Sequence, residues 1–177
     1  MRRFASGEAR AFEALYRRYE LRVFRYLLRH VRNPSLAEDL LQEVWFAVAR
    51  DAPRYVPLGR FSAWLFTLAH HRMMDAFRAS RPEVSWEALN RDDPLDSRPA
   101  PAGESPDAAV LAGEQLAVLL SALEELPAEQ RDAFLLQQEG GLSVEEIASA
   151  AGCSFETAKS RLRYARTKLR ERLGEIV

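Results

Sequence analysis

The feature that most constrains the fold is a two-helix pattern in residues 142–173. Ser143 and Glu146 form a capping box, which marks the start of a helix. Gly152 ends that helix, because only glycine enters the left-handed conformation without a steric cost. Ser154 caps a second helix, whose apolar stripe is spaced 3, 4, 3, 4. That stripe consists of Phe155, Ala158, Leu162, Ala165 and Leu169, which are expected to face the core.

The other sides of the second helix are cationic, with Lys159, Arg161, Arg163, Arg166, Lys168 and Arg170. A helix, a glycine-containing turn and a basic helix are typical of a helix-turn-helix that lays its second helix in a DNA groove. The pattern therefore predicts a DNA-binding domain.

Charge is segregated along the chain, although the formal net charge is only −1. Residues 1–81 hold 15 basic and 8 acidic side chains, and residues 154–177 hold 7 basic and 3 acidic ones. The segments between them are acidic: residues 82–107 hold 2 basic and 7 acidic side chains, and residues 108–153 hold 1 basic and 8 acidic ones. Two cationic segments favour two contacts with a polyanion. Ordinary solvated helix faces are the alternative.

Composition also limits where the protein acts. The single cysteine, Cys153, excludes an intramolecular disulfide and fits a reducing compartment. No apolar run approaches 18 residues, so we expect no membrane segment. The basic start lacks the apolar stretch of a secretory signal. We therefore predict a cytoplasmic protein.

A proline-rich, acidic stretch divides the chain. Five of the nine prolines lie between residues 81 and 107, where aliphatic residues are scarce. Such a segment cannot bury enough surface to fold alone. We interpret 82–107 as a flexible linker between a helical domain at 1–81 and a helix-turn-helix domain at 108–177. Fully extended, it would reach about 80 Å.

The remaining patterns predict an all-α fold. Apolar residues recur at helical spacing from Phe12 to Leu27, and Asn33-Pro34 breaks the pattern. Further helices are expected at 36–50, 61–78 and 108–126. Another should begin at Leu126-Pro127 and end at Gly140-Gly141.

The 36–50 helix has two contrasting sides. Leu40, Leu41, Val44, Trp45 and Val48 form an apolar side, whereas Asp39, Gln42, Glu43 and Phe46 share the other. An aromatic residue within an acidic surface is typical of a protein interface. A solvated face with one exposed phenylalanine explains the pattern equally well.

The 61–78 helix suggests a nucleic-acid surface. Its buried stripe is predicted to be Phe61, Leu65, Leu68, Ala69 and Ala76, widened by Phe66, Met73 and Phe77. Trp64, His71, Asp75 and Arg78 align on a separate side. A ring beside cationic groups suits single-stranded nucleic acid, because bases stack on the ring while cations hold phosphates. Alternatively, Trp64 belongs to the core.

We find no catalytic set. His71 and Asp75 have a spacing that can hold a metal, and His70 is adjacent, but only His30 and Cys153 remain as further soft ligands. Nucleotide-binding and nucleophile motifs are missing from the sequence, and Ser143 and Ser154 are explained as caps. We therefore expect no enzyme activity, no cofactor and no metal.

Taken together, these segments resemble the extracytoplasmic-function sigma factors, the two-domain members of the bacterial sigma-70 family. AEDLLQEVWFAVAR (37–50) is similar to their polymerase-binding helix, and FSAWLFTLAHHRMMDAFR (61–78) to their promoter-melting helix. LPAEQRDAFLL (126–136) and the segment 142–173 resemble their C-terminal DNA-binding domain. The resemblance covers nearly everything except the linker, with the motifs in the family's order.

The resemblance implies a role for each surface. Asp39, Gln42, Glu43 and Phe46 would bind core RNA polymerase. The −10 promoter element would be captured by Arg54, Tyr55, Arg60, Trp64, His71, Asp75 and Arg78. The −35 element would be bound by Thr157, Lys159, Ser160, Arg161, Arg163, Tyr164 and Arg166. An anti-sigma protein is a further implied partner.

Two positions depart from the family pattern: His71 stands where asparagine is common, and Tyr164 where a basic residue is usual. Two other hypotheses remain. An autonomous helix-turn-helix regulator would bind promoter DNA without polymerase, and a nucleic-acid enzyme would require a divalent metal.

Overall fold

The computed structural model describes residues 1–56, 59–80 and 106–174, with side-chain surroundings described except at 80 and 106–115. All regular structure in these ranges is helical, as predicted. The predicted linker at 82–107 lies almost entirely outside them. The helices are α1 (Arg2–Ala5), α2 (Ala9–Val31), α3 (Pro34–Asp51), a 3-10 turn (Ala52–Arg54), α4 (Phe61–Ser80), α5 (Pro106–Glu125), α6 (Ala128–Gln138), α7 (Val144–Ala150) and α8 (Phe155–Gly174).

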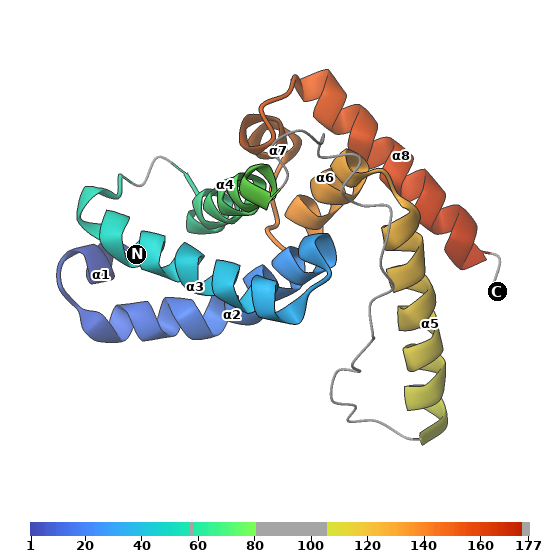
Figure 1. Ribbon diagram of the computed structural model, residues 1–177, viewed down its shortest axis with the longest axis horizontal. Helices are drawn as coiled ribbons and strands as arrows, with labels where there is room; N and C mark the ends of the chain where they lie inside the picture. The colour runs from blue at the N-terminus through green and yellow to red at the C-terminus, as the bar shows by residue number, and fades with distance from the viewer. Residues whose placement is uncertain (57–58, 81–105, 175–177) are drawn as a thin grey trace.

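The N-terminal half packs α3 and α4 against the long helix α2 (Figure 1). The break between α2 and α3 lies at the predicted position. Arg32 ends α2 in the left-handed conformation, at φ 51°. Asn33 then caps α3 by accepting a 3.1 Å hydrogen bond from the backbone N–H of Leu36. Pro34 occupies the first helical position, where its missing N–H costs nothing, so α3 begins there rather than at Leu36.

The C-terminal half contains the predicted helix-turn-helix. In the capping box, Glu146 N–H donates to Ser143 Oγ at 3.2 Å, and Ser143 N–H donates to Glu146 Oε2 at 2.8 Å. Gly152 has φ 61°, the left-handed value that the turn requires. Ser154 accepts a 3.1 Å hydrogen bond from Thr157 N–H at the start of α8. Each of these local predictions is confirmed.

Two predictions about buried faces were confirmed only in part. The fully buried side chains of α4 are Leu65, Phe66, Ala69 and Met73, with His70 at 8% exposure, whereas Phe61, Leu68 and Ala76 are partly exposed. The buried face is rotated because α2 and α7 as well as α3 pack on α4. In α8, Phe155 was expected in the core but is 41% exposed. It is the first residue of the helix, and the core is formed further along by Ala158, Leu162, Ala165 and Leu169.

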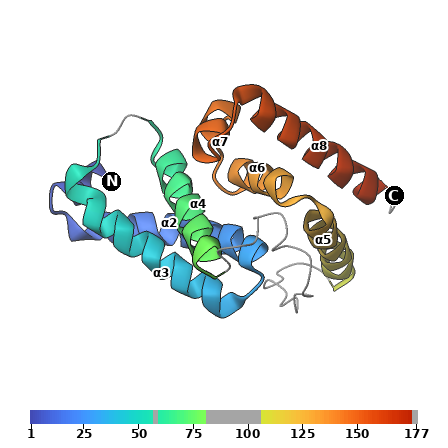
Figure 2. The ribbon, with the colours of Figure 1, turned by 45° about the horizontal axis from the view of Figure 1, so that its top comes forward.

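The two halves pack against each other, a contact that the sequence analysis did not predict. Helix α2 contacts α6, and α4 contacts α7, as the views in Figures 1 and 2 agree. One apolar cluster joins Phe66 and Met73 of α4 to Leu136, Leu142 and Ile147. At Gly140 an added Cβ would lie 2.9 Å from Phe66 Cγ, so only glycine permits this approach.

A polar cluster lies buried within this contact. Asp132 of α6 has 5% of its side chain exposed, His70 of α4 has 10% and His30 of α2 has none. The hydroxyl of Tyr26 donates to Asp132 Oδ1 at 2.7 Å. His70 Nδ1 lies 3.2 Å from Asp132 Oδ2, and His30 Nε2 lies 3.3 Å from Oδ1. The carboxylate is thus surrounded by polar side chains of the other half.

These neighbours change the acidity of Asp132. Burial alone would raise the pKa of its carboxyl, but attraction to His70 and hydrogen bonds from His30 and His70 outweigh burial. The pKa of Asp132 is therefore held well below its ordinary value.

We expect this depressed pKa to make the fold acid-sensitive. A carboxyl with a lowered pKa stabilises the fold above its unfolded pKa, about 3.9, and loses that contribution as the pH falls toward its folded pKa. In urea titrations, the free energy of unfolding should therefore fall as the pH drops below about 4. The Asp132→Asn variant should be less stable at pH 6 and should show a shallower fall below pH 4. Parallel acid profiles for the two proteins would contradict this assignment.

Candidate nucleic-acid and protein interfaces

Helix α3 presents the predicted acidic face to solvent. Asp39, Gln42 and Glu43 are exposed, and Phe46 has 72% of its surface accessible. The opposite side of α3 is buried by α2 and α4, as predicted, with Leu40, Leu41, Val44, Trp45 and Val48. A large exposed apolar ring on a face that also carries Asp39 and Glu43 is a combination typical of protein interfaces.

An aromatic cluster lies where the loop after the 3-10 turn meets α4. The ring of Tyr55 lies edge-on to Trp64, with centroids 5.1 Å apart. Phe61 joins both rings, at 6.3 Å from Tyr55 and 5.7 Å from Trp64, and its other side contacts Tyr19 at 5.5 Å. Sequence reasoning selected Tyr55 and Trp64 but assigned Phe61 to the core. All four rings are partly exposed, as a surface for base stacking requires.

The other residues selected on α4 continue along the same side. His71, Asp75 and Arg78 are exposed, and Arg78 forms a 3.0 Å ion pair with Asp75. From Trp64 to Arg78 the helix rises about 21 Å. One captured base therefore cannot contact the whole set, which forms a strip along α4 rather than a single pocket.

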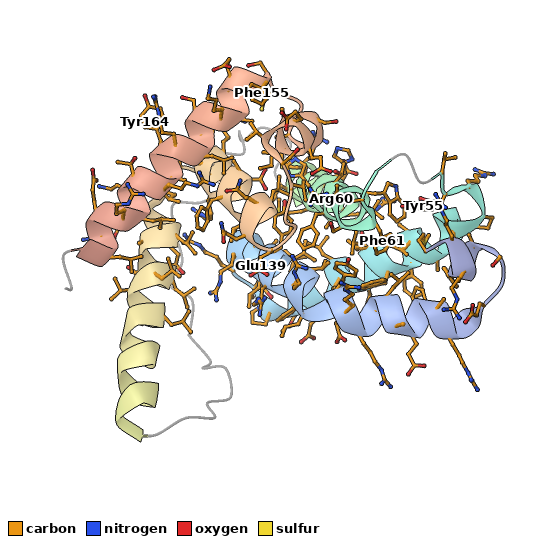
Figure 3. All side chains as sticks on the ribbon, turned by 180° about the vertical axis from the view of Figure 1, so that it is seen from behind. Tyr55, Arg60, Phe61, Glu139, Phe155 and Tyr164 are labelled. Carbon is orange, nitrogen blue, oxygen red and sulfur yellow. The ribbon has the colours of Figure 1, made fainter. Side chains whose placement is uncertain are left out.

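Two arginines flank the aromatic cluster differently. Arg54, in the 3-10 turn, is exposed. Arg60, next to the start of α4, pairs with Glu146 of α7, with Nε 3.4 Å from Oε1. Figure 3 shows Tyr55, Arg60 and Phe61 together at this end of α4.

Helix α8 presents its predicted groove-facing side to solvent. Thr157, Lys159, Arg163 and Tyr164 are exposed, and Ser160 is partly exposed. The Arg163 guanidinium lies 5.0 Å from the centroid of the Tyr164 ring, close enough for a cation–π contact. Phe155 and Tyr164 both lie along the outer edge of α8 (Figure 3).

The remaining two arginines lie at the edges of this surface, as their helical phase predicts. Arg161 is half-buried and pairs with Glu129 of α6 at 3.2 Å. Arg166 donates to the side chain of Gln137, also on α6, at 2.6 Å. Both side chains are therefore anchored to α6 by their polar ends, whereas the contact described for Arg163 is with Tyr164, its neighbour on α8.

The described ranges offer little support for a metal or a membrane segment. They contain no group of three or more histidine, cysteine, aspartate or glutamate residues placed to hold a metal ion. His70, a metal-ligand candidate from sequence, instead lies in the contact between the halves. Among the described helices none is long and apolar enough to cross a bilayer.

A helical domain with an exposed acidic helix, followed by a helix-turn-helix with a basic second helix, is the arrangement that the sequence analysis compared with bacterial transcription initiation factors. The family models agree: sigma-70 region 2 matches residues 15–83, and sigma-70 region 4 matches residues 116–169. This chain belongs to the sigma-70 family, in its extracytoplasmic-function group.

Relatives cover nearly the whole chain. It is 39% identical to the RNA polymerase sigma factor CarQ of Myxococcus xanthus, over 99% of this chain and 97% of CarQ. It is 32% identical to the extracytoplasmic-function sigma factor SigK of Mycolicibacterium vanbaalenii, over 98% of this chain and 87% of SigK.

Two solved structures share the fold. The sigma factor RpoE of Bartonella quintana, in complex with the anti-sigma factor NepR, matches with a TM-score of 0.73 and 25% identity over 94% of this chain and 98% of that one. CnrH in complex with the cytosolic domain of CnrY matches with a TM-score of 0.64 and 24% identity, over 97% of this chain and 92% of CnrH.

Proposed function

We propose that this protein is a promoter-specificity subunit. It binds core RNA polymerase through the acidic face of α3, opens the −10 element with the strip along α4, and reads the −35 element with the outer side of α8. The observation that supports this most strongly is that all three surfaces are exposed or partly exposed while the opposite sides of their helices form the core.

An anti-sigma protein is the further partner that we propose. The solved structure of RpoE holds an anti-sigma factor, NepR, and this chain shares the fold of RpoE.

Transcription with purified core polymerase tests the proposal. A pool of promoter fragments is transcribed with core alone and with core plus this protein, and the initiated transcripts are sequenced. We expect transcripts that depend on the protein and share two motifs about 20 base pairs apart. Specific binding of the free protein to such fragments, without stimulated initiation, would favour the autonomous regulator instead.

The −10 strip gives a prediction about strand opening. If His71 contacts an unstacked base, His71→Ala should reduce open-complex formation on duplex promoters by about tenfold, the scale of one lost base contact. On templates already mismatched at the −10 element the defect should shrink, because the cost of unpairing is already met. Permanganate reactivity of unpaired thymines measures both. A defect of equal size on both templates would contradict base capture.

The −35 surface gives a prediction about specificity. Base-edge contacts specify sequence, whereas phosphate contacts mainly add affinity. Arg163→Ala should therefore cost about 1–3 kcal/mol and change preference at one promoter position. Arg166→Ala should weaken binding to all promoter sequences alike. It should also reduce the slope of log affinity against log salt concentration by about the share of one phosphate contact. The affinity of holoenzyme for a series of promoter variants, measured at several salt concentrations, distinguishes a base contact from a phosphate contact. Uniform loss in both variants would make Arg163 a phosphate contact and leave reading to Lys159, Ser160 or Tyr164.

A further inference from the structure

Helix α8 carries two contacts between a cation and an aromatic ring. The Arg163 guanidinium lies 5.0 Å from the centroid of the Tyr164 ring, and Lys159 Nζ lies 5.8 Å from the centroid of the Phe155 ring. Both rings reach solvent, with 54% of Tyr164 and 41% of Phe155 exposed. Figure 3 shows the two rings along the outer edge of the helix. Both contacts therefore belong to the surface of α8 rather than to its core.

The cations of the proposed −35 surface differ in what their polar ends contact. Arg161 and Arg166 contact side chains of α6, and Lys159 has a carboxylate of its own helix 3.7 Å away. Arg163 has no such partner: within the described part of the chain, its guanidinium forms no hydrogen bond or ion pair. Its contact is with the Tyr164 ring. Arg163 is therefore the cation of this surface that an aromatic ring holds in place of an acceptor.

An aromatic ring can hold a guanidinium without using its hydrogen bonds. The ring attracts the charge and can stack on the flat group, whereas the N–H donors point outward in the plane of that group. A carboxylate in place of the ring would occupy some of those donors and would have to be displaced before DNA could bind. The ring contact also restricts a long side chain in advance, which reduces the conformational entropy lost on binding. Tyr164 thus restrains Arg163 and leaves its donors free for DNA.

The chemistry of a guanidinium selects one base. The group only donates hydrogen bonds, so it needs acceptors. In the major groove guanine presents two neighbouring acceptors, O6 and N7, and a planar fork binds both. Adenine presents one acceptor, N7, beside an amino donor that would face a donor of the guanidinium. A restrained arginine therefore favours guanine over the other bases.

We propose that Arg163 reads a guanine of the −35 element by a bidentate contact, and that Tyr164 is the positioning residue that holds the guanidinium for it. This inference rests on the proposed function for the identity of the DNA. The ring contact itself is a property of the free protein, so it is measured separately.

The first measurement is made on the free protein. Protons of Arg163 that lie over an aromatic ring are shifted upfield in proton NMR spectra. We expect Tyr164→Leu to remove this shift and Tyr164→Phe to retain it, because the second variant keeps the ring. Circular dichroism confirms that each variant stays helical. Unchanged Arg163 signals in Tyr164→Leu would show that the ring does not hold the guanidinium and would overturn the proposal.

The second measurement is the affinity of holoenzyme for fragments with each of the four bases at every position of the −35 element. The natural protein should prefer guanine at one position by about 5- to 150-fold, and Arg163→Ala should remove that preference. Tyr164→Leu should lower the preference by about two- to fivefold, the contribution of an exposed cation–π contact. Tyr164→Phe should retain it. A purely structural defect would instead lower the affinity for all four bases alike.

A modified base tests which atoms are read. 7-Deazaguanine replaces N7 by a C–H group but keeps O6 and the pairing with cytosine. At the same position it should cost the natural protein most of its preference, whereas Arg163→Ala should bind the two bases equally. Phe155→Leu is the matched control, since it removes the other exposed ring that lies beside a cation of α8. It should leave the preference for guanine unchanged.

Separate outcomes distinguish this inference from the proposed function. The same preference in the free protein, with no effect of core polymerase, would contradict the polymerase role but support the guanine contact. No base preference that depends on Arg163, or a preference for a base other than guanine, would overturn the inference. Equal losses in Tyr164→Phe and Tyr164→Leu would also overturn it, because the hydroxyl rather than the ring would then be responsible.

Discussion

Reversal of charge at Asp39 and Glu43 is expected to abolish most of the affinity for core RNA polymerase. Both carboxylates are exposed on α3 beside Phe46, and a partner that binds this face must present cationic groups to them. Asp39→Lys with Glu43→Lys would place like charges across that interface. We expect a loss of about 2–4 kcal/mol, or roughly 30- to 1,000-fold in Kd, measured by fluorescence anisotropy with purified core.

The control makes the same change in net charge elsewhere. Glu13→Lys and Glu145→Lys alter exposed carboxylates on α2 and α7 and should leave core binding within about twofold. The thermal unfolding of both double variants should be close to that of the natural protein, because exposed positions contribute little to stability. Equal affinity of the two double variants for core would show that α3 is not the polymerase contact.

Substitution of Arg131 is expected to have the largest effect on stability. Its side chain is 1% exposed and donates to the carbonyl oxygens of Glu124 at 3.2 Å, Leu126 at 3.1 Å and Arg29 at 3.5 Å. The first two belong to the end of α5 and the turn after it, where carbonyls have no partner within the helix. Burial, together with the charge of Arg32, lowers the pKa of Arg131 to about 10, still high enough to keep it charged at neutral pH.

Arg131→Met keeps the bulk of the side chain but removes these donors. Since each buried carbonyl left without a partner costs about 1–3 kcal/mol, we expect a loss of about 3 kcal/mol in the free energy of unfolding, measured by urea titration. Arg170→Met, at an exposed position of α8, should change it by less than about 0.5 kcal/mol. A loss below 1 kcal/mol in Arg131→Met would mean that water replaces the guanidinium.

Local signals in the sequence predicted the helices well. A capping box, a glycine in the left-handed conformation and an Asn-Pro break act within a few residues, so Ser143, Gly152 and Asn33 could be interpreted without knowing the fold. The 3.6-residue period likewise placed the exposed face of α3 and the buried stripe of α8 from Ala158 onward.

Contacts between distant helices could not be predicted in the same way. Periodicity shows which side of a helix is buried but not which helix covers it, so the packing of α6 and α7 on the N-terminal half was missed. One signal was available: Asp132 lies four residues from both Ala128 and Leu136, in the middle of an apolar stripe, and His70 lies between Phe66 and Met73 in the same way. A polar residue inside such a stripe indicates a buried partner elsewhere.

The aromatic cluster at the start of α4 shows a second limit of prediction from helical periodicity. Phe61 was assigned to the core because it fits the apolar period of α4. It reaches the surface because the period continues past the point where a neighbouring helix covers it. Phe155, at the first residue of α8, is exposed for the same reason.

Glu146 has two binding partners, so its carboxylate keeps one of them if the ion pair with Arg60 is broken. Its carboxylate is bound to Ser143 N–H at the start of α7 as well as to Arg60. Once the arginine leaves, the carboxylate still has a donor and the favourable end of the helix dipole, so the charge is not stranded. The start of α7 therefore keeps its capping box without Arg60, so the helix pair α7 and α8 does not depend on this ion pair for its local structure.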